Sequence, residues 1–375
     1  MKIAVTSPPW ISVPPSGYGG IERVVSNVVE GLTKKGHDVT LYATGDSKTT
    51  AKLSYLYQKA LGNHLPLKLN PYHILNHLYH FYKDAHNKFD IVHDNIGEIA
   101  LYFADLTKTP MVMTIHGTFN ENTKDLFKDY GTMHSVKELV QKFKHYPYIS
   151  ISNKQRESLP ELNYVATVYN SIILSEFDFN ETGGEDMIWI GRMNYTKGVD
   201  LGIKAAETLK KKFIISSYID SGDMPYYQKD IEPHLTQGFL SRTDELIDTK
   251  NKSQFLGNSK LFLFPIRWDE PFGIVMIEAM AAGTPLVAFS MGSVPEVMKD
   301  GETGFLVNPS DTDIRGNWII KKTGIEGLCE AIDRIYSMPD NQYKQMRKAC
   351  RAHVEKNFTI ERMVDRYEEV YKKLI

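Results

Sequence analysis

The sequence predicts an α/β fold made of two doubly wound domains, each built on a parallel sheet. Short buried strands alternate with amphipathic helices, and this alternation restarts near the middle of the chain. The length of 375 residues agrees, because ~150 residues per domain is typical. Ligands of such sheets bind at the carboxyl ends of the strands. We therefore expect the functional site in a central cleft that the two domains face.

The first half begins with a strand, a helix and a second strand. Residues 3–5 form a short apolar run, and a loop rich in proline and glycine follows over residues 8–20. Apolar side chains then recur at i, i+3, i+4 and i+7 over residues 21–32, which predicts an amphipathic helix. The next apolar run, residues 39–43, completes a βαβ unit and implies a parallel sheet. Further strands are expected at residues 91–93, 111–115 and 148–151.

The alternation restarts after a polar stretch, residues 180–186, which is the best candidate for a linker. A strand is expected at residues 187–190 and a helix at residues 199–209. Further strands are expected at residues 213–215, 261–264 and 286–289. The last helix carries one apolar face, formed by Met363, Tyr367, Val370, Tyr371 and Leu374.

Composition excludes several classes of protein. Hydrophobic residues make up 42% and charged residues 24% of the chain, as in globular proteins and unlike disordered ones. The 44 basic residues against 46 acidic ones leave no general basic field, so no nucleic-acid partner is expected. Two cysteines, Cys329 and Cys350, are too few for a disulfide framework or a four-cysteine zinc site. With no apolar run long enough for a signal peptide or a membrane span, we expect a cytoplasmic protein.

Two glutamates follow a strand of the second half. The expected strand 261–264 leads through a turn into an apolar helix, with Glu270 at the end of the strand and Glu278 inside the helix. A helix that is apolar on all sides is buried, and a buried carboxylate needs a hydrogen-bonding partner. The partner of Glu278 is either a ligand or a protein donor, and Glu270 either serves a ligand or caps the helix. Pro271 and Gly273 leave N–H groups at the helix start that favour an anion.

Two cations lie in one strand-to-helix loop of the same half. Arg192 and Lys197 follow the expected strand 187–190, between Gly191 and Gly198. Charge-assisted hydrogen bonds and close backbone approach suit a phosphate or diphosphate. A solvated loop with two surface charges is the alternative.

Two features of the first half are weaker signals. His116 follows the expected strand 111–115, at a position from which a side chain could reach a ligand. Taken alone, such a histidine is more often structural. The glycine loop 17–20 precedes the first helix and would allow a ligand to approach the backbone closely.

Together these motifs resemble the retaining glycosyltransferases of family 4, the glycogen synthase-like enzymes of glycosyltransferase group 1, which have the GT-B fold of two Rossmann-like domains. The matching elements are the glycine loop, His116-Gly117, the pair Arg192 and Lys197 with its flanking glycines, and Glu270 followed by Glu278. Residues 292–297 and 301–307 also match the family. The resemblance extends over nearly the whole chain and is most specific from residue 187 to residue 307.

The resemblance implies an enzyme that moves a hexose from a nucleoside-diphosphate sugar to a hydroxyl acceptor, with retention of the anomeric configuration. A UDP-hexose is the favoured donor and GDP-mannose is the alternative. The acceptor, a carbohydrate, a lipid or a small molecule, is not encoded in any recognisable motif. No metal and no other cofactor are expected, because cationic side chains stabilise the charge that a metal would stabilise elsewhere.

The resemblance also assigns roles to residues. Arg192 and Lys197 would hold the donor diphosphate and stabilise the leaving group. Glu278 would accept hydrogen bonds from the ribose, Glu270 would contact the donor sugar, and His116 would contact the transferred sugar. Gly19 and Gly20 would approach the phosphates, and the N–H groups around Gly273, Ile274 and Val275 would bind sugar or phosphate. Phe239 would contact the base, in a pocket formed by residues 237–240.

Domain boundaries follow from the same resemblance. An acceptor domain is expected over residues 1–175 and a donor domain over residues 176–357, with a helix over residues 358–375 packing back on the first domain. Two stretches depart from the family pattern. Residues 169–172 read Tyr-Asn-Ser-Ile where Asn-Gly-Ile or Asn-Gly-Val is usual, and residues 216–218 read Ser-Ser-Tyr where glycines are usual.

Other functions fit parts of the pattern. A GT-B-fold sugar-phosphate isomerase or phosphorylase would share the two domains, and so would a non-catalytic sugar-nucleotide binding protein. The second is disfavoured because both cations and both glutamates are present. A dinucleotide-dependent oxidoreductase is also disfavoured, because a G-x-G-x-x-G motif starting at Gly17 would need glycine where Glu22 stands.

Two more patterns allow further partners. His73, His77 and His80 have the spacing of one helix face and could bind zinc or nickel, although their aromatic neighbours favour a structural helix. Residues 135–145 form a basic amphipathic segment that could touch an anionic membrane, although a domain helix with a solvated lysine face is favoured. The oligomeric state is left open.

Overall fold

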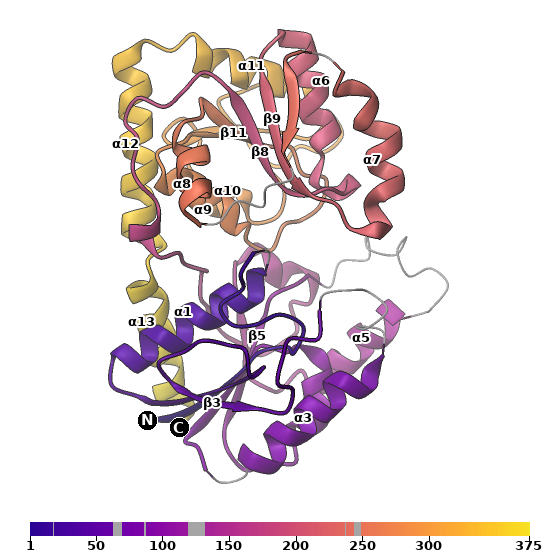
Figure 1. Cartoon of the computed structure of the whole chain (residues 1–375), viewed down its shortest axis with the longest axis vertical. Coiled ribbons are helices and arrows are strands. Elements are labelled where there is room, and N and C mark those ends of the chain that lie inside the picture. Colours follow the sequence, from indigo (N-terminus) through magenta and orange to yellow (C-terminus); the bar gives the residue numbers. More distant parts are fainter. Residues whose placement is uncertain (18, 63–69, 86–87, 119–131, 237, 244–248) are drawn as a thin grey trace. The chain divides into compact units, whose positions relative to one another are not determined.

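The computed structural model describes the chain except residues 18, 63–69, 86–87, 119–131, 237 and 244–248; for residues 132–136 and 249–250 it describes the backbone alone. The chain forms two compact units (Figure 1). The first unit contains Met1–Ser171 and Ile360–Ile375, and the second contains Ile172–Thr359. The chain thus enters the second unit after Ser171 and leaves it after Thr359. The sequence analysis expected these two boundaries after residues 175 and 357.

The first unit contains a parallel sheet of seven strands. Its order is β3-β2-β1-β4-β5-β6-β7. The strands are β1 Lys2–Thr6, β2 Asp38–Ala43, β3 Lys52–Tyr55, β4 Ile91–Asp94, β5 Met111–Ile115, β6 Tyr148–Ser150 and β7 Tyr164–Thr167. The sequence predicted the five inner strands, which are buried apolar runs. It did not predict the edge strands β3 and β7, because their side chains are partly exposed and lack such a run.

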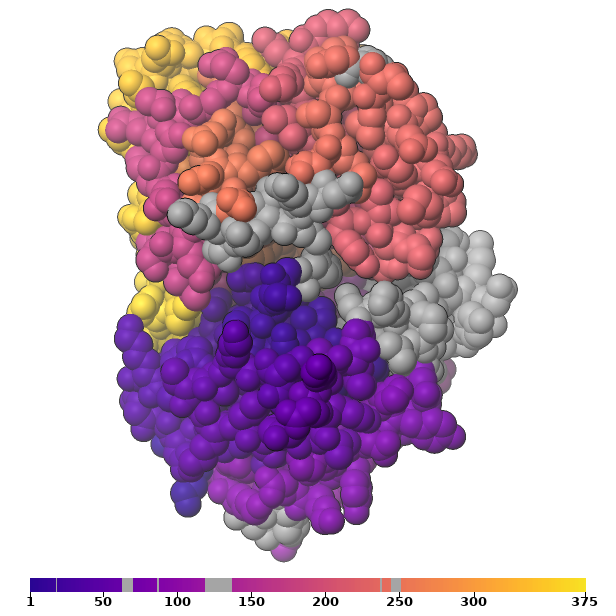
Figure 2. All heavy atoms as spheres, in the orientation of Figure 1, coloured from indigo at the N-terminus to yellow at the C-terminus, as the bar shows by residue number. Residues whose placement is uncertain are grey.

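Helices cover this sheet, and one of them comes from the end of the chain. They are α1 Gly20–Lys34, α3 Pro71–Ala85, α4 Leu101–Ala104, α5 Thr132–Lys142 and α13 Ile360–Leu374. Helix α13 packs against α1, and Figure 2 shows its yellow atoms beside the indigo atoms of the N-terminal segment. The approach is close at Gly31, where a Cβ atom would lie 2.4 Å from Cγ2 of Val364.

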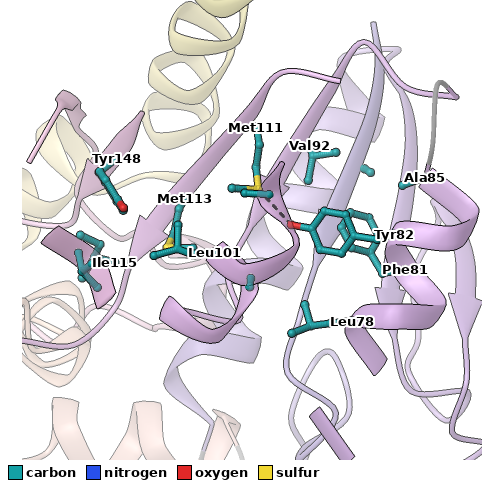
Figure 3. Packing of buried hydrophobic residues seen from close by; sticks show 14 of the residues in the cluster. Leu78, Phe81, Tyr82, Ala85, Val92, Leu101, Met111, Met113, Ile115 and Tyr148 are labelled. Atoms are coloured by element: carbon teal, nitrogen blue, oxygen red, sulfur yellow. Dashed lines mark hydrogen bonds between the residues drawn. The ribbon is translucent and has the colours of Figure 1, made fainter. Parts of the chain in front are cut away.

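The core of the first unit lies between α3, α4 and the sheet (Figure 3). Phe81 and Tyr82 pack edge to face with ring centroids 4.6 Å apart, and the Tyr82 hydroxyl donates to the Met111 sulfur at 3.1 Å. A polar connection ties α13 to this sheet. His93 of β4 contacts the Tyr371 hydroxyl and the Thr114 hydroxyl, each at 2.7 Å.

The second unit contains a parallel sheet of six strands in the order β10-β9-β8-β11-β12-β13. The strands are β8 Met187–Arg192, β9 Phe213–Tyr218, β10 Leu240–Thr243, β11 Leu261–Phe264, β12 Leu286–Phe289 and β13 Gly304–Val307. The helices are α6 Val199–Leu209, α7 Met224–Asp230, α8 Thr249–Gly257, α9 Ile274–Ala281, α10 Val294–Val297, α11 Gly324–Tyr336 and α12 Asp340–Asn357. Helix α6 packs with α11, whereas α9 contacts both α8 and α12.

A buried arginine fastens α12 to the rest of the second unit. The side chain of Arg347 is fully buried, and its guanidinium donates to three main-chain carbonyl oxygens within 2.9 Å. The distances are 2.7 Å to Asn180, 2.7 Å to Gly257 and 2.9 Å to Ser259. These bonds hold the segment before β8 and the end of α8 against α12.

No helix in the described part of the chain is both long enough and apolar enough to cross a bilayer.

Candidate functional site

The site of the second unit is built on the loop after β8, which carries Arg192 and Lys197. Asn194 shapes this loop, because its side-chain oxygen accepts a hydrogen bond from the Lys197 amide at 3.2 Å. Gly198 begins helix α6 with a φ of 70°, and a Cβ atom there would lie 1.9 Å from the carbonyl oxygen of Pro265. Glycine is therefore required, and the loop lies directly against the loop that follows β11.

The loop after β11 carries Glu270 and leads into α9. Gly273 precedes this helix with a φ of 78°, and a Cβ atom there would come within 2.7 Å of the Met276 methyl. The two loops are joined by a hydrogen bond from the Arg267 amide to the Thr196 carbonyl at 2.8 Å. Since β8 and β11 are neighbouring parallel strands, both loops lie at the same edge of the sheet.

Lys197 and Glu270 form an ion pair at this edge. The ammonium lies 2.5 Å from Oε2 of Glu270, and both side chains are largely buried. Trp268 takes part in the same arrangement. Its indole N–H donates to the same Oε2 at 2.9 Å, and its ring centroid lies 4.7 Å from the Lys197 ammonium. Glu270 does not cap α9, because Gly273 occupies the capping position without a side-chain cap.

A second ion pair braces the two loops. Arg267 donates to both carboxylate oxygens of Asp200, at 2.7 and 2.6 Å, and its guanidinium stacks 4.1 Å from the Tyr195 ring. Burial opposes ionisation of Asp200, but the hydrogen bonds from Arg267 and from the Tyr226 hydroxyl outweigh it and lower the pKa of Asp200. Asp200 therefore remains a carboxylate, and the brace remains charged at neutral pH.

Arg192 also has acidic neighbours. Its Nε donates to Asp223 at 2.6 Å, and Asp220 lies 3.8 Å from the guanidinium. Both carboxylates follow β9, the strand next to β8. The cation expected to bind phosphate is thus ion-paired within the protein, so an anionic ligand would have to compete with these carboxylates.

Glu278 lies in the middle of α9 and is almost fully buried. Its carboxylate forms an ion pair with Lys252 of α8. The structure therefore shows a protein donor for Glu278, which was one of the two alternatives from the sequence. Ile274 and Val275 occupy the first turn of α9, where backbone N–H groups lack partners within the helix.

The first unit places His116 directly after β5. Its Nε2 lies 2.9 Å from Oδ1 of Asn95, a residue that follows β4. Asn95 is buried, and its Nδ2 has no hydrogen-bond partner among the residues that the structure describes. Desolvation lowers the pKa of His116 to about 4, so the imidazole is neutral at pH 7. If Nε2 carries the proton, Nδ1 is the acceptor that remains.

The two glycines expected near phosphate differ in their surroundings. Gly19 precedes α1 and is buried, and a Cβ atom there would lie 2.7 Å from Cβ of Pro15. Gly20 is exposed and has open space around its Cα. Only Gly19 is thus restricted by packing. Tyr18, between them and Gly17, lies outside the described residues.

The structure contradicts the expectation for Phe239. This residue precedes β10, and its carbonyl accepts from the amide of Phe213, the first residue of β9. Phe239 therefore lies at the amino ends of the parallel strands, whereas Arg192 and Glu270 follow the carboxyl ends. The expectation rested on the family resemblance alone, and in this chain β10 begins at Leu240, so Phe239 precedes the strand.

The three spaced histidines of α3 have separate partners. His77 is buried and contacts the carbonyl of Ser7 at 3.0 Å, His80 contacts the Ser54 hydroxyl at 3.3 Å, and the His73 ring lies edge to face with Tyr57, with ring centroids 6.0 Å apart. Across the described residues, no group of three or more histidine, cysteine or acidic side chains is placed to hold a metal ion.

Sequence reasoning missed four residues that contact the expected site residues: Trp268, Lys252, Asp223 and Asn95. Trp268 and Asn95 had a usable signal, because each follows a predicted strand at the edge where ligands bind. Asp223 follows the predicted strand 213–215 only after a longer interval, and Lys252 follows no predicted strand closely; their ion pairing depends on helix and turn positions that periodicity does not fix.

Comparisons with known proteins identify the family of the chain. The family of glycosyl transferases group 1 matches residues 175–353, and glycosyltransferase family 4 matches residues 18–172. An uncharacterized glycosyltransferase of Methanocaldococcus jannaschii is 25% identical over 349 residues, which cover 84% of this chain and 86% of that protein.

Solved structures share the fold. Sucrose-phosphate synthase from Thermosynechococcus elongatus superimposes with a TM-score of 0.78 at 19% identity, covering 100% of this chain and 98% of the other. Anabaena HepE, solved in complex with UDP-glucose, superimposes with a TM-score of 0.71 at 15% identity, covering 100% of both chains. The fold is thus GT-B, with two Rossmann-like α/β domains, as the sequence predicted. The two family matches together cover both units, and the chain belongs to the group 1 glycosyltransferases, with a family 4 domain in its first half.

Proposed function

We propose that this glycosyltransferase moves a hexose from a nucleoside-diphosphate sugar to a hydroxyl acceptor with retention of configuration, and that it needs no metal or other cofactor. The observation that carries the proposal is the Lys197–Glu270 pair at the carboxyl ends of β8 and β11. UDP-glucose is the favoured donor, because HepE of the same fold was solved with it, and GDP-mannose is the alternative.

In this proposal the donor diphosphate replaces carboxylates as the partner of two cations. Lys197 leaves Glu270 for the diphosphate, and Arg192 shares its charge between Asp223 and the diphosphate. Both cations then stabilise the negative charge that grows on the diphosphate as the bond to the sugar breaks. The N–H groups at the start of α9 add to this effect through the helix dipole.

The transfer step needs one bond to form and one to break. The acceptor oxygen attacks the anomeric carbon from the face that the diphosphate leaves, and the departing diphosphate oxygen takes the acceptor proton. Glu270 accepts a hydrogen bond from a sugar hydroxyl and orients the sugar. The Glu278 carboxylate accepts a hydrogen bond from a ribose hydroxyl while it remains paired with Lys252.

The first unit would contribute Gly19, Gly20 and His116. A neutral His116, held through Nε2 by Asn95, can accept a hydrogen bond from a hydroxyl of the transferred sugar at Nδ1. Gly19 and Gly20 would allow the diphosphate to approach the start of α1, where the helix dipole favours negative charge.

A thermal-shift screen against nucleotide sugars tests the donor class. A ligand at 100 times its dissociation constant adds about 2.7 kcal/mol of stability, so the true donor should raise the melting temperature clearly. We expect UDP-glucose to give the largest shift in melting temperature. The largest shift with GDP-mannose would instead favour the alternative donor. A panel in which no nucleotide sugar shifts the melting temperature would count against the proposal.

Variants test the residues. Lys197→Ala and Glu270→Gln should abolish release of UDP from UDP-glucose while both proteins stay folded. Lys212→Ala is the matched control, because Lys212 forms an exposed ion pair with Asp186 at the other end of the sheet. Turnover by Lys197→Ala equal to that of the control would refute the assigned roles.

A further inference from the structure

We propose that Trp268 is a positioning residue that holds Glu270 in place for the donor sugar, an inference that rests on the proposed function. Trp268 lies in the loop between β11 and α9 and is partly accessible. Two parts of its side chain contact the ion pair. The indole N–H donates to Oε2 of Glu270 at 2.9 Å, and the ring face lies 4.7 Å from the Lys197 ammonium.

Both protein donors converge on one oxygen of Glu270. Lys197 and Trp268 each contact Oε2, at 2.5 and 2.9 Å. Within the described ranges no hydrogen bond reaches Oε1 of Glu270. The carboxylate is thus held by one oxygen, and the other is left to accept a hydrogen bond from a ligand hydroxyl.

Trp268 matters most when the donor binds, because Glu270 then needs a hydrogen-bond donor other than Lys197. A diphosphate attracts Lys197, and Glu270 then loses its cation. The Glu270 side chain is only 12% exposed, so water replaces that partner incompletely. The indole N–H is neutral and is not drawn to the diphosphate, so it stays with Oε2. Trp268 therefore keeps the carboxylate oriented while Lys197 moves, and the ring face supports the ammonium as it moves.

The backbone of this loop does not depend on the Trp268 side chain. The Arg267 amide donates to Thr196 at 2.8 Å, and the Ser293 amide donates to the Glu270 carbonyl at 2.9 Å. A change at Trp268 that preserves the ring should therefore leave the loop in place. Trp268→Phe is the nearest such change, since it keeps an aromatic face, although a smaller one, for Lys197 and removes the N–H donor.

The test compares two ligands by isothermal titration calorimetry. UDP reports the diphosphate contacts, and UDP-glucose adds the sugar contacts. For Trp268→Phe we expect the affinity for UDP to stay within about threefold of wild type, because the ring face remains. We expect the affinity for UDP-glucose to fall ~10-fold or more, the usual effect of losing a hydrogen bond to a charged group.

Trp318→Phe is the matched control. Its indole nitrogen is buried and has no hydrogen-bond partner among the described residues, so removing this N–H should change neither affinity. A double variant completes the design. If Trp268 acts through Glu270, adding Trp268→Phe to Glu270→Gln should cost no further UDP-glucose affinity, whereas an independent structural role would multiply the two losses.

The outcomes separate the two hypotheses. Equal losses for UDP and UDP-glucose, no loss for either, or multiplying losses in the double variant would each overturn the role of Trp268 and leave the proposed function standing. A wild-type protein that binds neither UDP nor UDP-glucose would overturn the UDP-hexose assignment, and the Trp268 inference with it.

Discussion

Replacing Arg347 with methionine should destabilise the second unit strongly. The guanidinium has no carboxylate partner among the contacts described above and is satisfied by main-chain carbonyls, three of them within 2.9 Å. Methionine fills a similar volume but donates no hydrogen bond. The three carbonyl oxygens, of Asn180, Gly257 and Ser259, would then be buried without these donors.

The magnitude follows from these three bonds. A buried acceptor left without its donor costs ~1–3 kcal/mol, which gives ~3–9 kcal/mol for three. Methionine also avoids burying a cation, and that gain offsets part of the loss. We therefore expect Arg347→Met to lower the free energy of unfolding by ~3–5 kcal/mol. Since single domains are stable by only ~5–15 kcal/mol, much of the stability of this unit would be lost.

Urea denaturation followed by tryptophan fluorescence is a suitable assay, because Trp189, Trp268 and Trp318 all lie in the second unit. Lys348→Met is the matched control. Lys348 is the next residue of α12 and forms an exposed ion pair with Glu181, which is worth at most ~1 kcal/mol. A destabilisation of Arg347→Met no larger than that of Lys348→Met, at an unchanged urea m-value, would refute the reasoning.

Three further predictions concern the site and the first unit. Gly292→Ala should reduce UDP release from UDP-glucose by ~100-fold, because a Cβ atom at this position would lie 2.4 Å from the backbone nitrogen of Glu270. Circular dichroism should show that the variant stays folded. Asp223→Asn should strengthen UDP binding about fivefold in calorimetry, because a carboxylate that competes with the diphosphate loses its charge; weaker binding would contradict this. Urea midpoints should fall between pH 7 and pH 5, because burial lowers the pKa of His77 to about 4 and of His93 to about 3. Each histidine lowers the free energy of unfolding by about 1.4 kcal/mol for every pH unit below its unfolded pKa of ~6.5. Burial raises the pKa of Asp94 to about 6, so below pH 6 this carboxyl offsets the effect of one histidine. Equal urea midpoints at pH 7 and pH 5 would refute this prediction.

The sequence predicted the parts of the fold that burial determines. Inner strands such as β5 and β11 are buried along their whole length, and they appear as short apolar runs. The edge strands β3 and β7 depend on pairing with one neighbour and carry no such run. Helix α13 was recognised as amphipathic from its spacing, but its membership of the first unit came only from a family resemblance.

Site residues could be predicted where a charged side chain comes soon after a predicted strand. Arg192, Lys197 and Glu270 were identified because parallel strands bring their carboxyl ends to one edge. Asp223, the partner of Arg192, and Lys252, the partner of Glu278, were not identified, because they lie in elements whose packing no local pattern specifies. Phe239 was misplaced because its role came from the family resemblance alone, whereas in this chain it precedes β10, at the amino ends of the strands.

The position of α13 has a consequence for the order in which the protein is made. The second unit is complete once Thr359 has been synthesised, whereas the first unit lacks α13 until the segment 360–375 follows. Until then, His93 has no Tyr371 to contact, and Gly31 has no Val364 packed against it. The half of the protein that the ribosome makes first is therefore the half that finishes folding last. Loss of residues 360–375 would therefore weaken the first unit rather than the second.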